Sequence, residues 1–318
     1  MNYSRRERRG EIKVSRETSN AWGKNPRLLQ NHTLDSTRWL EYPFRDGDIV
    51  LANWAKSGVT WLQQIVSQLV FGGAEGIPAM DVSPWIDWRF HPMEEMLRLL
   101  ESQDHRRFVK THLAADALVY SAAARYIYIG RDGRDVIWSW HHHHSHLTPL
   151  VYEALDSLPP IGPRLERPNR DFRQYFHDWL DGDGAPMWPF WSHVQSWWDL
   201  RDLPNVMLVH FNELRRDLPG QIRAIARFLS INVDEANWPR ILTHCSFDYM
   251  KRTAAQLSAV LDASFVGGAQ TFVNRGTGGN WRDALTPDDI RKYDRHCAAN
   301  LTPESDVWLR TGRREQAA

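Results

Sequence analysis

The sequence has few cysteines, no long hydrophobic run and no surplus of charge. Its 318 residues include only Cys245 and Cys297, which rules out a disulfide framework and leaves at most one bridge. No apolar stretch approaches the roughly 18 residues of a membrane span. The basic N-terminal segment is not followed by the apolar core of a secretory signal. From these absences we expect a soluble protein of the reducing cytoplasm.

Basic and acidic side chains balance, because 39 Lys and Arg residues stand against 39 Asp and Glu residues. A protein that binds nucleic acid usually carries a basic surplus that displaces counterions, so nucleic acid is not an expected partner. Overall neutrality still allows a local basic pocket. Tryptophan, by contrast, is plentiful: 16 indoles require either burial or a large apolar ligand.

Four short apolar runs are typical of buried strands. They cover residues 48–53, 107–111, 126–130 and 206–211, and each is nearly continuously apolar, as in a parallel sheet with both faces covered. Helical patterns follow three of these runs, at 61–70, at 135–142 and from Pro219 onward. Strands that alternate with helices predict a three-layer α/β/α fold around a central parallel sheet.

We expect one domain with loop insertions, spanning residues 45–300. The polar residues 1–44 are expected to form an N-terminal arm, and 301–318 a C-terminal tail. Residues 149–188, rich in Pro, Gly and acids, are interpreted as a lid or insertion. In open α/β sheets, ligands bind beyond the carboxyl ends of the strands, so the segments that follow the strands are the expected site.

The segment after the first strand joins a lysine, two hydroxyls and a glycine to the start of a helix. It reads Lys56-Ser57-Gly58-Val59-Thr60-Trp61, and the free N–H groups of such a helix start bind phosphate or sulfate. It lacks the GxxxxGK[ST] order of nucleoside-triphosphate loops, because Lys56 precedes the glycine. An ordinary strand-to-helix turn has the same composition, so both interpretations stay open for this segment alone.

Basic residues also follow the next two strands. At the end of the second strand stand Lys110 and His112, where an imidazole of ordinary pKa near 6.5 could take a proton from a hydroxyl. Arg131 follows the third strand, and its planar guanidinium suits a phosphate. Ser139 faces the same ligand if the helix begins nearby. The alternatives are a structural histidine and a salt-bridge cluster that caps the helix.

Two further segments contain residue types that can bind ligands. The run His141–His144 does not predict a metal site, because consecutive helix positions point about 100° apart. Only a wider pair such as His142 and His146 shares a face, with no carboxylate or thiol to complete the site. The glycine-rich segment 270–281 carries one arginine, which is typical of a loop that closes over an anion; its alternative is a plain surface loop.

Taken in order, six segments resemble the cytosolic-type sulfotransferase family. They are KSGVTW, KTHL, YIYIGRDGRDVIWSW, VMLVHFNEL, CSFDYM and FVNRGTGGNW, and they cover about residues 45–295. The stretch 83–112 is also loosely similar to mycobacterial sulfotransferases that act on glycolipids or small acceptors. Members transfer a sulfuryl group from 3'-phosphoadenosine 5'-phosphosulfate (PAPS) to an alcohol or amine. The resemblance implies a P-loop-like fold, release of 3'-phosphoadenosine 5'-phosphate (PAP), and no metal.

The resemblance also implies roles for single residues. His112 matches the general base, Lys56 the group that stabilises the leaving group, and Lys110 and Ser139 complete the catalytic set. Trp61 would stack on the adenine of the donor. The residues implied in donor binding are Lys56, Ser57, Gly58, Val59, Thr60, Trp61, Arg131, Ser139, Phe211, Cys245, Phe247, Met250, Asn274, Arg275 and Gly276.

The sequence departs from the family pattern at three places. Asn274 replaces one basic residue of the closing loop, so we expect weaker donor binding. Phe211 replaces a tyrosine near the adenine, which removes a hydrogen bond. Thr286-Pro287 and Arg291 break the short dimer motif, so the usual dimer is not assumed.

Two other functions are alternatives to a sulfotransferase. A phosphotransferase would need the GK[ST] order and a magnesium-binding carboxylate after a strand, and neither is present. A catalytically weak homologue that binds PAPS, a nucleotide or a glycan stays open. The acceptor is also open among a phenol, a sterol, a glycolipid and a small alcohol. The aromatic residues expected either to border its cavity or to fill the core are Trp85, Trp88, Phe90, Trp179, Trp188 and Trp191.

Overall fold

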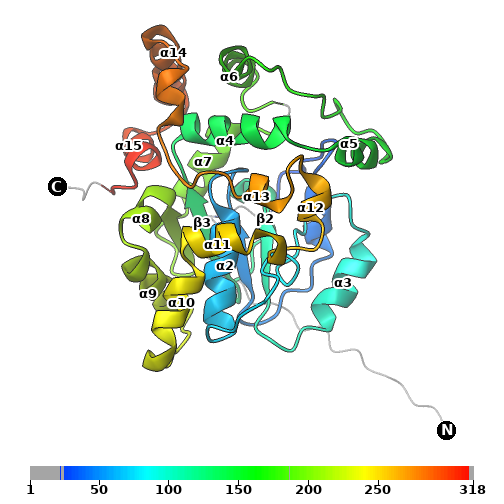
Figure 1. Ribbon diagram of the computed structural model, residues 1–318, viewed down its shortest axis with the longest axis vertical. Coiled ribbons are helices and arrows are strands. Elements are labelled where there is room, and N and C mark those ends of the chain that lie inside the picture. Colours follow the sequence, from blue (N-terminus) through cyan, green and yellow to red (C-terminus); the bar gives the residue numbers. More distant parts are fainter. Residues whose placement is uncertain (1–21, 23–24, 186, 315–318) are drawn as a thin grey trace.

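Four parallel strands form the centre of the protein. The computed structural model describes residue 22 and residues 25–185 and 187–314. The strands are β1 (Ile49–Ala52), β2 (Phe108–Thr111), β3 (Arg125–Gly130) and β4 (Val206–His210). They lie in the order β2-β1-β3-β4, and every neighbouring pair is parallel. The expected strands and the parallel sheet are therefore confirmed (Figure 1).

Helices surround this sheet. In chain order, the α-helices are α2 (Val59–Val70), α3 (Met93–Glu101), α4 (Gly133–Ser145), α5 (Pro149–Asp156), α6 (Phe172–Asp181), α7 (Phe190–Trp198), α8 (Phe211–Arg216), α9 (Leu218–Phe228), α10 (Trp238–His244), α11 (Phe247–Arg252), α12 (Leu261–Ser264), α13 (Ala269–Phe272), α14 (Pro287–Asn300) and α15 (Pro303–Thr311). The 3-10 helices are η1 (Ser36–Leu40), η2 (Ala115–Ala117), η3 (Glu235–Asn237), η4 (Ala254–Gln256) and η5 (Asn280–Asp283). The helices expected after the first, third and fourth strands are α2, α4 and α9, and Pro219 lies in the first turn of α9.

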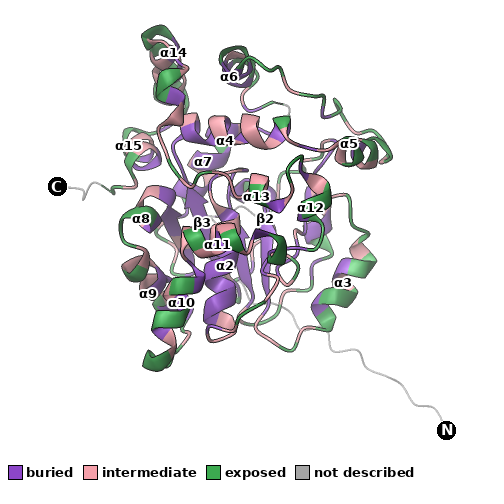
Figure 2. Ribbon diagram, in the orientation of Figure 1, coloured by how far each residue is buried: buried purple, intermediate pink, exposed green. Residues whose placement is uncertain are grey.

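Alternate residues of the strands face two different helical layers. Ile49 and Leu51 of β1 pack with α2, α9 and α10. Val50 and Ala52 belong to the larger core on the opposite face, where α4 and α7 pack. Since side chains alternate between the faces of a sheet, helices on both faces bury the strands along their whole length (Figure 2). This is why the strands read as continuous apolar runs.

Segments outside the expected domain boundaries also contribute to the core. Within the expected N-terminal arm, Leu34 and Trp39 are fully buried. Within the expected C-terminal tail, α15 buries Trp308, whose ring occupies the space where a side chain at Gly130 would lie. The stretch 149–188, interpreted from the sequence as a lid or insertion, contains α5 and α6. These segments add buried apolar side chains to the core, and the strand–helix pattern of the sequence does not reveal them.

The departure from the dimer motif coincides with the start of a helix. The side chain of Thr286 accepts a hydrogen bond from the backbone N–H of Asp289, and the Asp289 carboxylate accepts one from the backbone of Thr286. Pro287 occupies the first turn, where its missing N–H has no consequence. Thr286-Pro287 therefore begins α14.

Candidate active site

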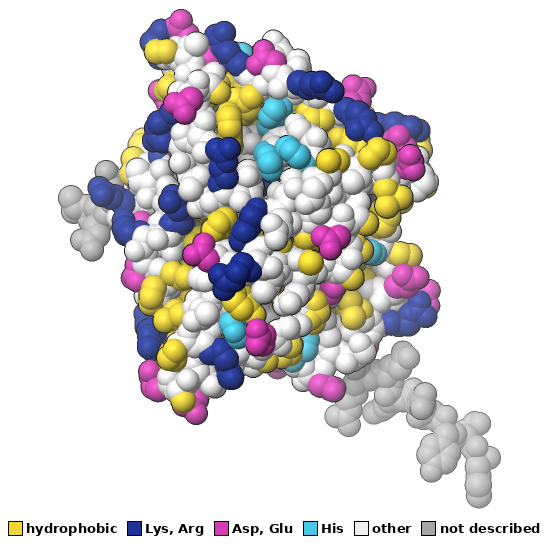
Figure 3. Space-filling model, viewed as in Figure 1, with side chains coloured by type: hydrophobic (Ala, Val, Ile, Leu, Met, Phe, Trp, Pro, Cys, Tyr) yellow, Lys and Arg dark blue, Asp and Glu magenta, His cyan; other side chains and the backbone are white. Residues whose placement is uncertain are grey.

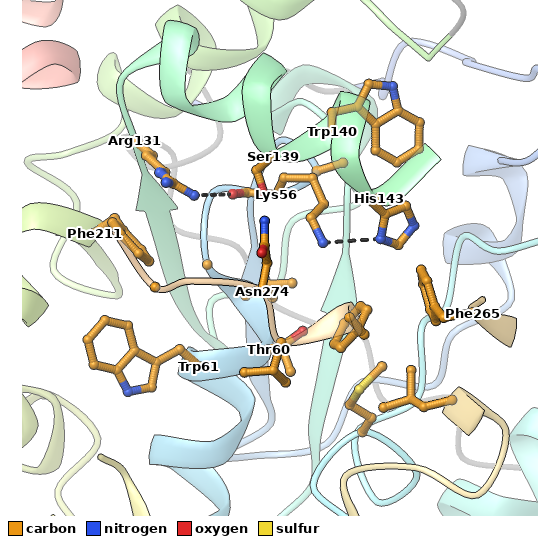
Figure 4. A pocket seen from close by; sticks show the side chains of 18 of the residues that line it. Lys56, Thr60, Trp61, Arg131, Ser139, Trp140, His143, Phe211, Phe265 and Asn274 are labelled. Carbon is orange, nitrogen blue, oxygen red and sulfur yellow. Dashed lines mark hydrogen bonds between the residues drawn. The ribbon is translucent and has the colours of Figure 1, made fainter. Parts of the chain in front are cut away.

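A cavity of about 660 Å³ lies at the carboxyl ends of β1, β2 and β3, as expected for an open α/β sheet. The predicted site residues that line it are Lys56, Gly58, Val59, Thr60, Trp61, Lys110, His112, Arg131, Ser139, Phe211, Phe247, Met250, Asn274, Arg275 and Gly276. Two predicted residues, Ser57 and Cys245, are buried and do not line it. The structure thus brings residues from six separated segments to one place. Figure 4 shows Lys56, Arg131, Phe211 and Asn274 around this space.

The loop after β1 presents backbone N–H groups to the cavity. Lys56 has a φ of 68° and Gly58 one of 118°, and Gly58 caps α2 without a side-chain hydrogen bond. A Cβ at Gly58 would lie 3.0 Å from side-chain atoms of Ile129 and Phe211, in a backbone conformation that favours glycine. The first N–H groups of α2 are therefore available to an anion.

Lys56 places its ammonium inside the cavity. Its Nζ lies 3.1 Å from Nδ1 of His143 and 4.7 Å from the ring centroid of Phe272. Burial lowers the pKa of Lys56 to about 7, and the neighbouring cations Lys110 and Arg131 act in the same direction. Because an anion nearby favours the charged form of a lysine, the arrival of a phosphate or sulfate would stabilise the ammonium.

His112 directly follows β2 and keeps one ring nitrogen available. Its Nδ1 lies 3.0 Å from the carbonyl oxygen of Asn53. Because a carbonyl only accepts, Nδ1 carries the proton and Nε2 keeps its lone pair. Burial lowers the pKa of His112 well below 6.5, and Lys110 adds to this shift, so the imidazole is neutral near pH 7. Trp85 packs edge-on at 4.5 Å and Trp188 stacks at 5.6 Å, which fixes the ring plane.

Asp87 is a buried carboxylate that the sequence analysis did not single out. It accepts hydrogen bonds from the backbone N–H of His112 at 3.1 Å and from the indole N–H of Trp85 at 2.8 Å. Burial raises its pKa, and these hydrogen bonds oppose the shift. Asp87 also opposes the effect of burial on Lys110, whose pKa is lowered to about 8. The sequence signal that could have pointed to Asp87 is an acidic residue between two tryptophans, in Trp85-Ile86-Asp87-Trp88.

Arg131 connects the loop after β1 with the late loop. Its guanidinium donates hydrogen bonds to the carbonyl oxygens of Lys56 at 3.2 Å and Thr277 at 2.9 Å. It also lies 4.2 Å from the ring centroid of Phe211. Its Nε is buried without a hydrogen-bond partner among the described residues. Ser139 of α4 lines the same cavity.

The late loop is anchored by Lys251, another residue that the sequence analysis missed. Its ammonium donates to three backbone carbonyls between residues 270 and 274. Gly276 has a φ of 64°, and a Cβ there would collide with the ring of Phe247. Arg275 is exposed and lines the cavity. Lysine contacts with distant carbonyls leave no periodic signal, so this anchor cannot be found from the sequence pattern.

Aromatic side chains line one end of the cavity. Trp61 and Phe211 pack edge to face with their centroids 5.6 Å apart. The indole N–H of Trp61 donates to the carbonyl oxygen of Cys245 at 2.7 Å, and Phe247 and Met250 line the same space. Burial raises the pKa of the Cys245 thiol, so this residue contributes its backbone oxygen and not a thiolate.

The other end of the cavity is apolar. Figure 4 shows Phe265 and His143 on one side of the pocket, with Trp61 and Phe211 on the other. The apolar residues that line the cavity beyond the donor motifs include Met80, Trp85, Trp88, Leu147, Val151, Leu155, Leu165, Met187, Val260, Leu261 and Phe265.

The aromatic residues expected near the acceptor divide between cavity and core. Trp85 and Trp88 line the cavity. Trp179 and Trp191 are buried in the core, Trp188 is buried against His112, and Phe90 is 39% exposed.

Neither a membrane span nor a metal cluster is found in the described part of the chain. None of the helices there combines the length and apolar character needed to cross a bilayer. Over the same residues, His, Cys, Asp and Glu side chains form no group of three or more that could bind a metal ion.

Comparison with known proteins identifies the family. The model of the sulfotransferase domain matches residues 46–304. The chain is 30% identical over 303 residues to the glycolipid sulfotransferase of Mycobacterium bovis (strain BCG / Pasteur 1173P2), covering 88% of this chain and 93% of that protein. It is 26% identical to the luciferin sulfotransferase of Photinus pyralis, over 86% of this chain and 78% of that one.

A solved structure shares the fold. The mouse sulfotransferase SULT7A1 complexed with PAP superposes with a TM-score of 0.64 at 23% identity, covering 83% of this chain and 88% of that one. This likeness confirms the expected P-loop-like α/β fold. Because the family match spans most of the chain and the 30% identical relative is covered almost entirely, the chain belongs to the sulfotransferase family.

Proposed function

We propose that this protein transfers a sulfuryl group from PAPS to a hydroxyl group of an apolar acceptor, such as a lipid or glycolipid, an apolar alcohol or a phenol. The observation that carries the proposal is the shared cavity, in which the neutral imidazole of His112, the ammonium of Lys56 and an apolar wall meet. The similarity to a glycolipid sulfotransferase supports a lipid-like acceptor.

The donor end suits a polyanion that carries an aromatic base. The first N–H groups of α2 and the ammonium of Lys56 would hold the phosphosulfate group. The buried, unpartnered Nε of Arg131 and the hydroxyl of Ser139 would hold the 3'-phosphate, with Arg275 as a second, exposed contact. Trp61 offers a flat apolar face for the adenine. Each group of the donor thus has a matching element in the cavity.

In this scheme His112 acts as the general base. Its Nε2 accepts the proton of the acceptor hydroxyl while the acceptor oxygen forms a bond to sulfur. The bridging S–O bond breaks, and its electron pair stays on the departing phosphate oxygen. Lys56 and the N-terminus of α2 neutralise the negative charge that develops there, and Lys110 adds a second positive charge near the transferred group.

The acceptor end supports an apolar molecule because its walls come from aliphatic and aromatic side chains. Such walls stabilise a bound acceptor by removing apolar surface from water. His112 lies where this wall meets the donor end, so a hydroxyl at the end of an apolar body could reach Nε2. The cytoplasmic location expected from the sequence stays a prediction.

An acceptor screen tests the proposal. The full chain is incubated with PAPS and a panel of long-chain alcohols, phenols, sterols, glycolipids and free sugars, and products are read by mass spectrometry for added sulfate. We expect PAPS-dependent sulfation of apolar members and little of free sugars. If calorimetry shows PAP binding but no acceptor is sulfated, the protein is a binding homologue. A preference for free sugars would overturn the apolar acceptor.

A further inference from the structure

His143 points into the cavity, unlike the other histidines of its run. Histidine side chains gather near α4 on the face shown in Figure 3. His141 and His142 lie against backbone oxygens outside the run, and His144 lies 3.0 Å from the hydroxyl of Tyr175. His143 instead lines the cavity beside Lys56 (Figure 4). The transfer scheme gives it no role.

Aromatic rings fix the orientation of His143. Trp140 stacks on its ring at 5.2 Å, and Phe265 and Phe272 pack edge-on at 4.9 and 5.9 Å. With the ring held on several sides, its Nδ1 stays 3.1 Å from Nζ of Lys56. His143 therefore contacts the donor loop on one side and the apolar wall on the other.

The ammonium of Lys56 is surrounded mainly by positive or neutral groups. The titratable groups that interact with it are Lys110 and His112 from β2 and its end, Arg131 after β3, and His142 and His143 on α4. Arg275 of the late loop acts on His142. Among the described residues, Lys56 Nζ has one hydrogen-bond acceptor, which is Nδ1 of His143. A hydrogen-bond acceptor at this place favours the charged form of the buried ammonium, against burial and the neighbouring cations.

His143 is suited to accept. Burial lowers its pKa well below 6.5, and the charge of Lys56 and the neighbouring Lys110, His142 and His144 add to that shift. The imidazole is therefore neutral near pH 7, with an unprotonated Nδ1 facing an ammonium that can only donate.

We propose that His143 is a positioning residue, whose neutral Nδ1 accepts a hydrogen bond from Lys56 and keeps the ammonium charged and aimed into the cavity. This inference rests on the proposed function, in which Lys56 stabilises the leaving group. It assigns to His143 the task of setting both the charge and the direction of Lys56 where the donor and acceptor ends of the cavity meet.

Two substitutions separate the hydrogen bond from the packing. His143→Phe keeps a flat ring among its aromatic neighbours and removes the acceptor, whereas His143→Asn places an amide oxygen near the position of Nδ1. His141→Phe, on the same helix, is the matched control. Thermal unfolding of each variant monitors the fold.

The pH profile of kcat/KM for PAPS is the main measurement. Loss of a hydrogen bond to a charged group should lower kcat/KM of His143→Phe about tenfold near pH 8. The deficit should shrink towards pH 6, because Lys56 is protonated there even without the acceptor. We expect His143→Asn to recover most of the loss and His141→Phe to match the unmodified protein. If kcat/KM fell equally in His143→Phe and His143→Asn at every pH, the role of His143 would be merely structural and the inference would be overturned.

A titration that does not depend on turnover separates the two proposals. The side-chain carbon signal of Lys56, identified by its loss in Lys56→Arg, is followed by NMR from acidic to alkaline pH. We expect the midpoint to move to lower pH in His143→Phe, and an unchanged midpoint would overturn the inference. Full activity of Lys56→Ala would instead refute the role proposed for Lys56, whatever the titration shows for His143.

Discussion

The two ends of the cavity are built in different ways. The proposed donor end is built mainly on segments at the carboxyl ends of parallel strands, which supply the start of α2 and the cations Lys56, Lys110 and Arg131. The acceptor end is made of side chains from α5, α12 and the segments between strands and helices. Strand order and the start of α2 determine the donor end, whereas the packing of these helices and loops determines the acceptor end.

This difference has a chemical consequence. An anion site depends on a few directional contacts, so the loss of one partner leaves a charge or a donor uncompensated. An apolar wall distributes its contribution over many contacts, each of which is weak. We therefore expect substitutions of buried charged groups at the donor end and of His112 to have larger effects than those along the acceptor wall.

The largest expected effect is at His112, where the two ends meet. His112→Ala should lower kcat by about a thousandfold because it removes the base that takes the hydroxyl proton. The affinity for PAP, measured by calorimetry, should stay nearly unchanged. His112→Asn is the sharper variant, since its amide N–H can still donate to the carbonyl of Asn53 while no group replaces Nε2. Turnover of either variant at the unmodified rate would show that another group is the base.

A smaller effect is expected at Arg131. Arg131→Ala should weaken PAP binding about thirtyfold, because a buried guanidinium that would pair with phosphate is lost. Arg275→Ala should weaken it only about threefold, since an exposed charge pair is screened by water. Calorimetric titrations of PAP into both variants test the ranking. An unchanged affinity for Arg131→Ala, or a larger loss for Arg275→Ala, would contradict the assignment of the 3'-phosphate to Arg131.

The sequence was informative where local patterns carry the structure. Continuously apolar runs predicted all four strands, and Gly58 marked the start of α2, where we propose that an anion binds, because both follow from backbone geometry. Long-range contacts were out of reach. Asp87 lies 25 positions before His112 and bonds its backbone, and His143 meets Lys56 across 87 positions. Nothing in the spacing of these residues shows that they touch.

The same reasoning explains why two of the predicted site residues do not line the cavity. Ser57 and Cys245 belong to segments that the structure does bring to the site, yet both side chains are buried. Motif order places a segment near a ligand, but the direction of each side chain depends on the turn of the backbone. The buried Trp308 likewise lies beyond the expected domain limits, because its partners Tyr128 and Trp198 are distant in sequence.

An effect smaller than that at Arg131 is expected on the acceptor wall, where α5 offers a matched pair. Val151 lines the cavity, whereas the adjacent Leu150 is 58% exposed and does not line it. Val151→Trp should raise the KM for an apolar acceptor about tenfold by filling space that the acceptor would occupy. PAP affinity should stay unchanged, and Leu150→Trp should behave like the unmodified protein. Steady-state kinetics with one sulfated acceptor from the screen provides the measurement. Equal KM values for both variants would place the acceptor elsewhere, and a loss of PAP affinity in Val151→Trp would show that the two ends of the cavity are not separate.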